Sequence, residues 1–342
     1  MSKVFFQNDY GEGAHPLVMR RLVETNMEHT CGYGLDEYSQ KAAQAILAQV
    51  KNPAAQVHMM TGGTSANMIA LSASMRPFEA VVCAPTGHIN VHETGAVEGS
   101  GHKCLPCLSR DGKALPEGVR EVCRLHPDEH MVHPRVLYIS QSTEIGTAYT
   151  LEELTALRAV CDECGLLLYI DGARLGSALA SKGCDVTLED LGRLADAFYI
   201  GGTKNGLLFG EAMVICNPAL QPHFRYMIKN RGGMMAKGRL CGVMFLAAFE
   251  NGDYFKWAAH VNAMADVIRE AMGKVGIRQY VETTTNQVFP VITRVQRDLL
   301  AESFAFERWE DLEGENCVIR FVTSWATTLE DVRRLADALE AL

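Results

Sequence analysis

Lys204 is the residue whose surroundings in the sequence most clearly indicate chemistry. It lies in the stretch YIGGTKNG, residues 199–206, after a short apolar run and among glycines. A lysine at a strand end commonly bends back to solvent. When it is desolvated instead, it loses its proton more easily and can attack a carbonyl carbon. The glycines leave space for a large group beside this lysine, so the stretch predicts a lysine that tethers pyridoxal phosphate.

The stretch TGGTSAN, residues 61–67, has the features of a phosphate site. It follows an expected strand and opens an expected helix, so flexible glycines, hydroxyl groups and unpaired backbone N–H groups meet at a helix N-terminus. An ordinary capped turn between a strand and a helix would look the same. The stretch lacks the GK[ST] ending of a P-loop and the spacing of GxGxxG, which argues against nucleotide binding by either route.

Two more stretches place polar side chains directly after apolar runs. In YIDGARLG, residues 169–176, Asp171 ends such a run, where it either caps a helix or pairs with the ring nitrogen of the cofactor. In GHINVHETGA, residues 87–96, His88 comes shortly after the run VVCA. A histidine there is often an ordinary loop residue, but its flat ring can also stack on a cofactor and move protons.

Metal binding is not expected. His88, His92 and Glu93 lie close together in the sequence, but their spacing is not that of HExxH. Two CxxC pairs, which begin at Cys104 and Cys161, are too far apart for the usual zinc ribbon. Neither group therefore predicts a metal site.

The apolar pattern indicates the elements that hold these residues. From about residue 57, short apolar runs alternate with helix-like segments, as in VHMM before SANMIALSASM and VLYIS before LEELTALRAVCDECG. Continuous apolar strands separated by helices predict an α/β fold, with a parallel or mostly parallel sheet covered by helices on both faces. Ligands of such sheets bind beyond the carboxyl ends of the strands.

The character of the chain changes near residue 240. A helix-like stretch from about Arg239 to Asn251 precedes a long amphipathic segment to about Lys274, then VFPVI, CVIRFVTSW and a final helix-like stretch. We therefore expect a large cofactor-binding domain, residues 1–240, and a smaller C-terminal α+β domain, residues 241–342.

Composition and charge argue against several classes of partner. The chain has 342 residues, 48% of them hydrophobic, so it can bury a large core. Its formal net charge is -9, and binding to nucleic acid or to an anionic membrane surface is therefore not expected. No apolar run is long enough to span a membrane. Eleven cysteines in no regular framework indicate reduced thiols, and hence a cytoplasmic protein.

Together these stretches resemble the threonine aldolase and β-eliminating lyase family of pyridoxal phosphate enzymes. The likeness covers nearly the full chain, through NDYGEGAHP, GYGLDEYS, TGGTSAN, GHINVHETGA, ISQSTEIGTAYTLEEL, YIDGARLG, GGTKNG and CVIRFVTSW. It implies the fold of the fold-type I (aspartate-aminotransferase-like) enzymes, with pyridoxal 5'-phosphate as cofactor.

The resemblance also implies which residues hold the cofactor. Lys204 is expected to carry it covalently, Asp171 to face its ring nitrogen and His88 to stack on its ring. The cofactor phosphate is expected at Gly62, Gly63 and Thr64.

The substrate residues are implied in the same way. Arg174, which also borders the cofactor, and Arg320 are expected to hold the substrate carboxylate, together with Asn8. Family members form their sites between the subunits of a dimer or a dimer of dimers. The resemblance therefore implies a homodimer or homotetramer, and the residues expected to reach a site across the subunit boundary are Tyr33, Lys229 and Lys237.

The implied reaction is cleavage of an L-3-hydroxy-α-amino acid, such as threonine or allo-threonine, to glycine and an aldehyde. His88 is the base expected to remove the β-hydroxyl proton, and Glu144 is the second choice. Many family members have a histidine at the position of Glu144, whereas this chain reads QSTE at 141–144. Asn8 likewise stands where a serine is common. The alternatives are a β-eliminating lyase or aminotransferase on the same scaffold and, more remotely, a non-catalytic protein that binds the cofactor.

Overall fold

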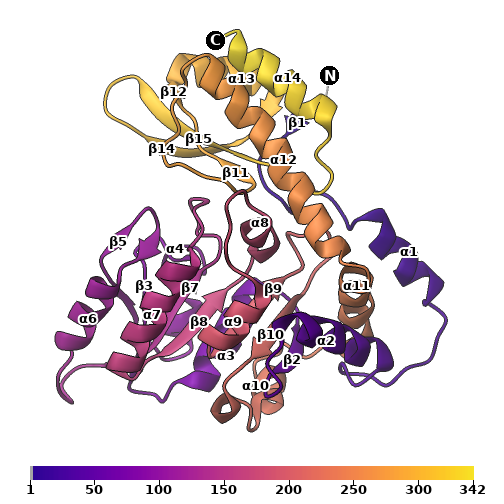
Figure 1. Ribbon diagram of the computed structural model, residues 1–342, viewed down its shortest axis with the longest axis vertical. Helices are drawn as coiled ribbons and strands as arrows, with labels where there is room; N and C mark the ends of the chain where they lie inside the picture. Colours follow the sequence, from indigo (N-terminus) through magenta and orange to yellow (C-terminus); the bar gives the residue numbers. More distant parts are fainter. Residues whose placement is uncertain (1–2) are drawn as a thin grey trace.

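The larger part of the molecule is built on one twisted sheet of seven strands (Figure 1). The computed structural model describes residues 3–342. The strand order is β2-β10-β9-β8-β7-β3-β4, and only β10 runs against its neighbours. This confirms the predicted mostly parallel sheet. The strands are β2 (Gln56–Met60), β3 (Glu79–Cys83), β4 (Cys104–Pro106), β7 (His133–Ser140), β8 (Leu167–Asp171), β9 (Ala197–Gly201) and β10 (Glu211–Ile215).

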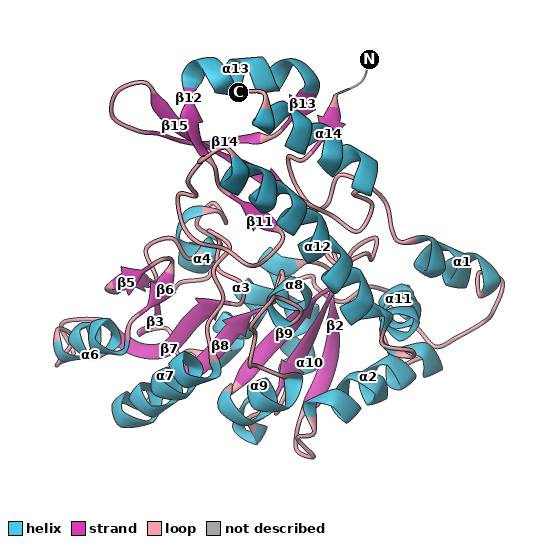
Figure 2. Cartoon of the chain, turned by 45° about the horizontal axis from the view of Figure 1, so that its top comes forward, coloured by secondary structure: helices cyan, strands magenta, loops and turns pink. Residues whose placement is uncertain are grey.

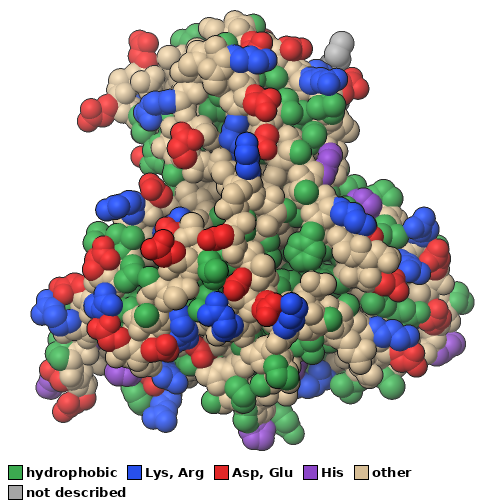
Figure 3. Space-filling view, viewed as in Figure 1, with side chains coloured by type: hydrophobic (Ala, Val, Ile, Leu, Met, Phe, Trp, Pro, Cys, Tyr) green, Lys and Arg blue, Asp and Glu red, His purple; other side chains and the backbone are tan. Residues whose placement is uncertain are grey.

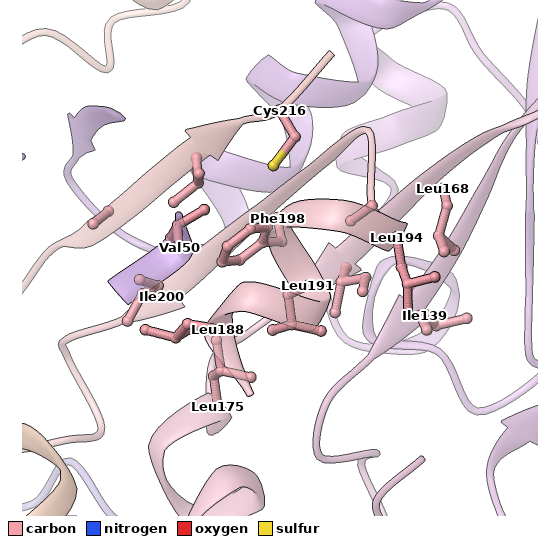
Figure 4. Close-up of a cluster of buried hydrophobic side chains, with 14 of the residues drawn as sticks. Val50, Ile139, Leu168, Leu175, Leu188, Leu191, Leu194, Phe198, Ile200 and Cys216 are labelled. Atoms are coloured by element: carbon pink, nitrogen blue, oxygen red, sulfur yellow. The ribbon is translucent and has the colours of Figure 1, made fainter. Parts of the chain in front are cut away.

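Both faces of this sheet are apolar, because successive side chains along a buried strand point to opposite sides. In β9, Phe198 and Ile200 belong to one hydrophobic cluster and Tyr199 to another. Figure 4 shows Phe198 and Ile200 on the same side as Leu191. The helices that cover the first face are α2 (Glu37–Val50), α6 (Pro116–Arg124), α7 (Leu151–Cys164), α9 (Leu188–Leu194) and α11 (Arg239–Phe249), and those on the second are α3 (Gly63–Ser74), α5 (Ala96–Gly99) and α10 (Phe224–Asn230).

Local sequence signals set the ends of these helices. The Thr150 hydroxyl accepts the Glu153 backbone N–H while the Glu153 carboxylate accepts that of Thr150, so α7 begins with a capping box. It ends at Gly165, whose φ of 69° is left-handed and favours glycine. The sequence therefore encodes both ends of this helix.

A smaller unit lies above the sheet in Figure 2 and has its own hydrophobic core. Its antiparallel strands are β11 (Gln287–Val288), β12 (Val291–Thr293), β14 (Glu307–Asp311) and β15 (Asn316–Val322), and its helices are α13 (Arg294–Ser303) and α14 (Leu329–Glu340). The N-terminal strand β1 (Val4–Phe5) also belongs here, because it pairs in parallel with β13 (Phe304–Ala305).

Helix α12 (Asp253–Lys274) joins the two units. Its residues Tyr254 and Trp257 lie in the core of the large unit, whereas Ala265 and Ile268 lie in that of the small one. The preceding α11 packs into the large core through Phe245. The predicted division at residue 240 stays a prediction, and this packing favours a boundary inside α12.

The remaining elements are short or peripheral: α1 (Pro16–Glu24), α4 (His88–Val91), β5 (Ser109–Arg110), β6 (Lys113–Ala114), α8 (Leu175–Leu179) and the 3-10 helix Pro218–Leu220. Within residues 3–342 no helix is long and apolar enough to cross a membrane. Figure 3 shows acidic and basic side chains interspersed over the face in view.

Candidate active site

One cavity, of about 350 Å³, lies where the strands of the large sheet end. Strands β2, β3, β7, β8 and β9 run in the same direction, so the segments that follow them meet at one edge. The cavity walls bring together these predicted residues: Gly62, Gly63, Thr64, His88, Glu144, Asp171, Arg174 and Lys204. Residues predicted from stretches far apart in the chain thus lie around one cavity.

Lys204 lies in the turn that follows β9. Burial lowers its pKa, and the charge of the nearby Arg174 guanidinium lowers it further, while nearby carboxylates act in the opposite direction without reversing the shift. The Nζ atom lies 5.8 Å from the centre of the Tyr10 ring. The amine is therefore easier to deprotonate than an ordinary lysine, as a nucleophile requires.

Asp171 ends β8 on the floor of the cavity and is 3% exposed. Its Oδ2 accepts hydrogen bonds from the hydroxyl of Tyr138 at 2.7 Å and from Nδ2 of Asn67 at 2.8 Å. Its Oδ1 accepts from the hydroxyl of Tyr199 and from the backbone N–H of Ala173. These donors to both oxygens fix the orientation of the carboxylate. Asp171 does not cap α8, because the N-cap of that helix is Arg174.

His88 begins α4, and its imidazole borders the cavity. Its Nδ1 lies 2.8 Å from Oε1 of Glu93. Its backbone N–H donates to Oε1 of Glu144 at 2.9 Å, and that oxygen also accepts from the hydroxyl of Ser140. Burial raises the pKa of Glu144 despite these hydrogen bonds. The two candidate proton carriers are thus neighbours in one hydrogen-bonded cluster.

Arg174 lies against Asp9, a residue that the sequence analysis did not single out. Nε of the arginine donates to Oδ2 of the aspartate at 2.7 Å, and Nη2 donates to Oδ1 at 3.1 Å. The side-chain amide of Asn286 donates to the same carboxylate. Burial favours the neutral form of Asp9, but the charges of Arg174 and Lys204 outweigh it and hold the pKa of this carboxyl below its usual value. The only signal in the sequence is an acid next to the predicted Asn8.

Arg320 reaches toward the site from β15 of the small unit but does not line the cavity. Its Nη1 donates to Gln287 at 2.9 Å and its Nη2 pairs with Glu307, while its guanidinium lies 5.2 Å from the centre of the Trp309 ring. Its Nε is buried without a hydrogen-bond partner. Burial lowers the pKa of Arg320, and the charge of the nearby Arg174 acts in the same direction. Two arginines therefore converge on one region, which suits an anionic ligand.

The N-terminus of α3 forms another wall of the cavity. Its N-cap, Gly62, has no side chain to accept the first N–H groups of the helix. A side chain at Gly62 would meet no atom within 4 Å, whereas one at Gly63 would lie 3.1 Å from the Tyr199 hydroxyl. Open space in front of a helix N-terminus is suited to a phosphate group.

Glu211 is a further wall residue that sequence reasoning missed. It begins β10, and because this strand runs against its neighbours, its first residue pairs with the last residues of β2 and β9. Its carboxylate accepts from the backbone N–H of Gly202 at 2.8 Å and from the hydroxyl of Thr203 at 2.7 Å. Burial raises the pKa of Glu211 to about 7 against these opposing hydrogen bonds. A carboxyl group that changes charge near neutral pH therefore lies beside Lys204.

Other predicted residues lie outside the cavity. The side chain of Asn8 accepts the backbone N–H of Tyr10. Tyr33 borders a separate, narrower cavity, and Nζ of Lys229 lies 4.5 Å from the centre of its ring. Lys237 is exposed. Their expected contacts across a subunit boundary stay predictions.

Comparisons with known proteins show the family to which the chain belongs. The profile of the β-eliminating lyase family matches residues 13–294. A low specificity L-threonine aldolase of Pseudomonas aeruginosa is 31% identical over 97% of this chain and 95% of its own length. The enzyme of the same name from Escherichia coli K12 is 28% identical over 93% of both chains.

Solved structures give the same relationship. A Leishmania major threonine aldolase superimposes with a TM-score of 0.97 at 41% identity and covers 99% of both chains. A Thermus thermophilus aspartate aminotransferase has a TM-score of 0.72 at 13% identity, over 99% of this chain and 91% of its own. The second likeness shows the fold alone, and the predicted aspartate-aminotransferase-like arrangement is confirmed.

Proposed function

Because the chain belongs to the β-eliminating lyase family, we propose that it is a pyridoxal phosphate-dependent aldolase. It cleaves an L-3-hydroxy-α-amino acid of the threonine type to glycine and an aldehyde. The observation that carries this assignment is the meeting of Lys204, Asp171 and Arg174 in one cavity of a chain that matches threonine aldolases over nearly its full length.

The residues of the cavity fit pyridoxal 5'-phosphate. Lys204 supplies an amine of lowered pKa, and Asp171 supplies a hydrogen-bonded carboxylate. The space in front of Gly62 at the α3 N-terminus suits the phosphate, together with Gly63 and Thr64. When bound there, the cofactor supplies an electron-accepting ring for the pair of electrons released as Cα–Cβ breaks.

The chain's own groups would orient the substrate. Asp9 occupies Nε and Nη2 of Arg174, so Nη1 stays available for a carboxylate oxygen. Arg320 is the second proposed contact for this anion, which it would reach by turning from Gln287 and Glu307 toward the cavity. Asn8 and, across a subunit boundary, Tyr33 are further proposed substrate contacts. This arrangement holds the carboxylate end of the substrate and leaves its hydroxyl end toward His88.

His88 is the proposed base for the β-hydroxyl proton, because its ring borders the cavity and its Nδ1 is already engaged. Glu144 stays the second candidate. Burial raises the pKa of this carboxyl above its usual value, and its Oε1 accepts the backbone N–H of His88. The β-hydroxyl proton thus moves to the imidazole, which becomes an imidazolium close to Glu144.

We propose that the enzyme is a homodimer or homotetramer in the cytoplasm. Lys229 and Lys237 would then reach a neighbouring subunit's site. The eleven cysteines carry free thiols, which suits a reducing compartment. Light scattering on the purified holoenzyme gives the number of subunits, and a monomer would rule out the shared site.

A product assay separates the aldolase from its rivals. The purified holoenzyme should convert threonine or allo-threonine to equimolar glycine and aldehyde, and it should also catalyse the reverse addition of glycine to the aldehyde. Ammonia with a keto acid would identify an eliminating lyase, and amino transfer to an acceptor would identify an aminotransferase. A protein that binds the cofactor without turnover of any amino acid would support the non-catalytic alternative.

A further inference from the structure

We propose that Glu93 is a positioning residue for this reaction: it holds a proton on Nδ1 of His88 and so leaves Nε2 of the same ring free to accept the substrate proton. The inference rests on the proposed function, because that function makes His88 the base. It adds a residue and an atom assignment that the aldolase activity alone does not specify.

The position of Glu93 follows from the turn between α4 and α5. Thr94 and Gly95 have φ values of 53° and 71°, so the chain reverses directly after Glu93. The Glu93 side chain is 0% exposed, while that of His88 is 33% exposed. A buried carboxylate without a defined partner is costly, so its contacts with neighbouring groups must account for its position.

The hydrogen bonds of Glu93 define the protonation of the imidazole. Oε1 lies 2.8 Å from Nδ1 of His88 and 2.7 Å from Nδ2 of Asn67. A carboxylate has no hydrogen to donate, so Oε1 accepts in both of these contacts. Nδ1 must therefore carry a hydrogen, and a neutral imidazole has only one, so Nε2 is the free acceptor.

The orientation of the Asn67 amide supports this assignment. Its Nδ2 lies between two carboxylates, since it also donates to Oδ2 of Asp171 at 2.8 Å. Its Oδ1 accepts from the hydroxyl of Tyr169 at 3.0 Å. A flipped amide would place its oxygen against both carboxylates and lose these bonds. Asn67 thus joins the carboxylate behind the proposed base to the carboxylate expected at the cofactor nitrogen.

The backbone of His88 is fixed independently of its ring. Its N–H donates to Glu144, whereas the ring contacts Glu93 from the other end of the residue. The other oxygen of Glu93, Oε2, is buried without a hydrogen-bond partner. Glu93 therefore directs its protein contacts through the one oxygen that faces His88 and Asn67.

Nitrogen NMR of the holoenzyme labelled with ¹⁵N-histidine tests the assignment directly. The ring signals of His88 are identified by their loss in His88→Phe. In the neutral ring we expect Nδ1 to carry the hydrogen and Nε2 to carry none. A signal pattern with the hydrogen on Nε2 would overturn the proposal. This measurement needs no Glu93 variant and no turnover, so it stays decisive if the Glu93 variants fail to fold.

Glu93→Gln supplies the second test, because it keeps the shape of the side chain but offers an N–H that can donate to Nδ1. We expect less of the tautomer protonated at Nδ1, with kcat lowered at least about tenfold and KM changed less than about threefold. Glu93→Asp, which keeps the charge, should retain the tautomer and recover part of kcat. Unchanged kcat and tautomer in Glu93→Gln would contradict the positioning role.

Glu79→Gln is the matched control. Glu79 is also a buried carboxylate, but it accepts the backbone N–H of Arg76 and lies outside the cavity. The variant Glu79→Gln should leave the His88 tautomer unchanged even if it lowers the stability of the protein. The proposed function is tested by a separate measurement. Release of ammonia in place of glycine by the wild-type enzyme would exclude the aldolase without changing the His88 signals.

Discussion

Asp9 holds Arg174 through two parallel hydrogen bonds, from Nε to Oδ2 at 2.7 Å and from Nη2 to Oδ1 at 3.1 Å. The two residues are 165 positions apart in the sequence. Both side chains are buried, so the pair fixes the guanidinium plane at the cavity wall. A fixed plane presents its remaining N–H groups to a carboxylate in one direction. The Asp9–Arg174 pair should therefore strengthen substrate binding.

Asp9→Asn should destabilise the protein and raise KM. The change leaves the buried Arg174 guanidinium without a countercharge, which costs about 3–5 kcal/mol in comparable cases. Urea unfolding gives the loss of stability, and steady-state kinetics gives KM. The control is Asp311→Asn, because Asp311 forms an exposed pair with Arg294 that contributes about 0–1 kcal/mol.

The stability difference for Asp9 depends on pH with a definite sign. The pKa of Asp9 is lowered in the folded state from its ordinary value of 3.8. Its contribution is therefore fully present above that value and is lost as the pH falls through the folded-state pKa. The wild type and Asp9→Asn should become more similar in stability in strongly acidic solution. A constant difference down to that range would contradict the ion pair as its cause.

Lys204→Ala should abolish turnover without loss of stability. Because burial disfavours the ammonium form of Lys204, removal of the amine should leave the unfolding temperature unchanged or raise it. Borohydride reduction of the wild type, followed by peptide mapping, should place the cofactor on Lys204. Lys182→Ala, at an exposed position, should keep full activity. An adduct on another lysine would remove Lys204 from its proposed role.

Arg320→Ala should raise KM more than it lowers kcat. A charge-assisted hydrogen bond to a carboxylate contributes about 1.5–3 kcal/mol, which corresponds to roughly a ten- to hundredfold change in KM. Arg308→Ala is the control, since Arg308 is an exposed arginine on the adjacent strand β14. If Arg320→Ala lowered stability but left KM unchanged, Arg320 would serve only its contacts with Glu307 and Trp309.

The sequence predicted the strands and helices well, because the buried strands are nearly continuous apolar runs and the long helices carry their own caps. It also singled out Lys204, Asp171 and His88, which lie at or shortly after the carboxyl ends of strands and line one cavity. The carboxyl ends of parallel strands lie at one edge of the sheet, so the topology alone predicts that these residues are close together.

The residues that the sequence did not identify act through tertiary contacts. Asp9 and Glu93 gain their roles from partners that folding brings to them, and neither has a distinctive spacing. Asn67 lies within an expected apolar helix, where nothing in the pattern indicates that it contacts two carboxylates. Glu211 reaches the site because β10 is antiparallel, a direction that the apolar run does not reveal. The boundary near residue 240 was equally hard to infer, since α12 contributes to both cores.

Glu211→Gln should change the pH dependence of stability in the cofactor-free protein. Burial raises the pKa of Glu211 from 4.5 to about 7, so the folded state binds a proton more tightly than the unfolded state does. The resulting stabilisation is fully present below about pH 4.5 and is lost as the pH rises through about 7. A shift of this size corresponds to about 3 kcal/mol.

Glutamine keeps an oxygen that can accept from Gly202 and Thr203 but cannot ionise, so the variant lacks this pH dependence. Between pH 5 and pH 8, the wild type should therefore lose stability relative to Glu211→Gln. Urea unfolding at several pH values measures the difference, and Glu250→Gln, at an exposed position, serves as the control. Parallel pH curves for the wild type and Glu211→Gln would show that Glu211 stays ionised across this range. The Glu211 carboxylate would then act as a countercharge for the Lys204 ammonium group.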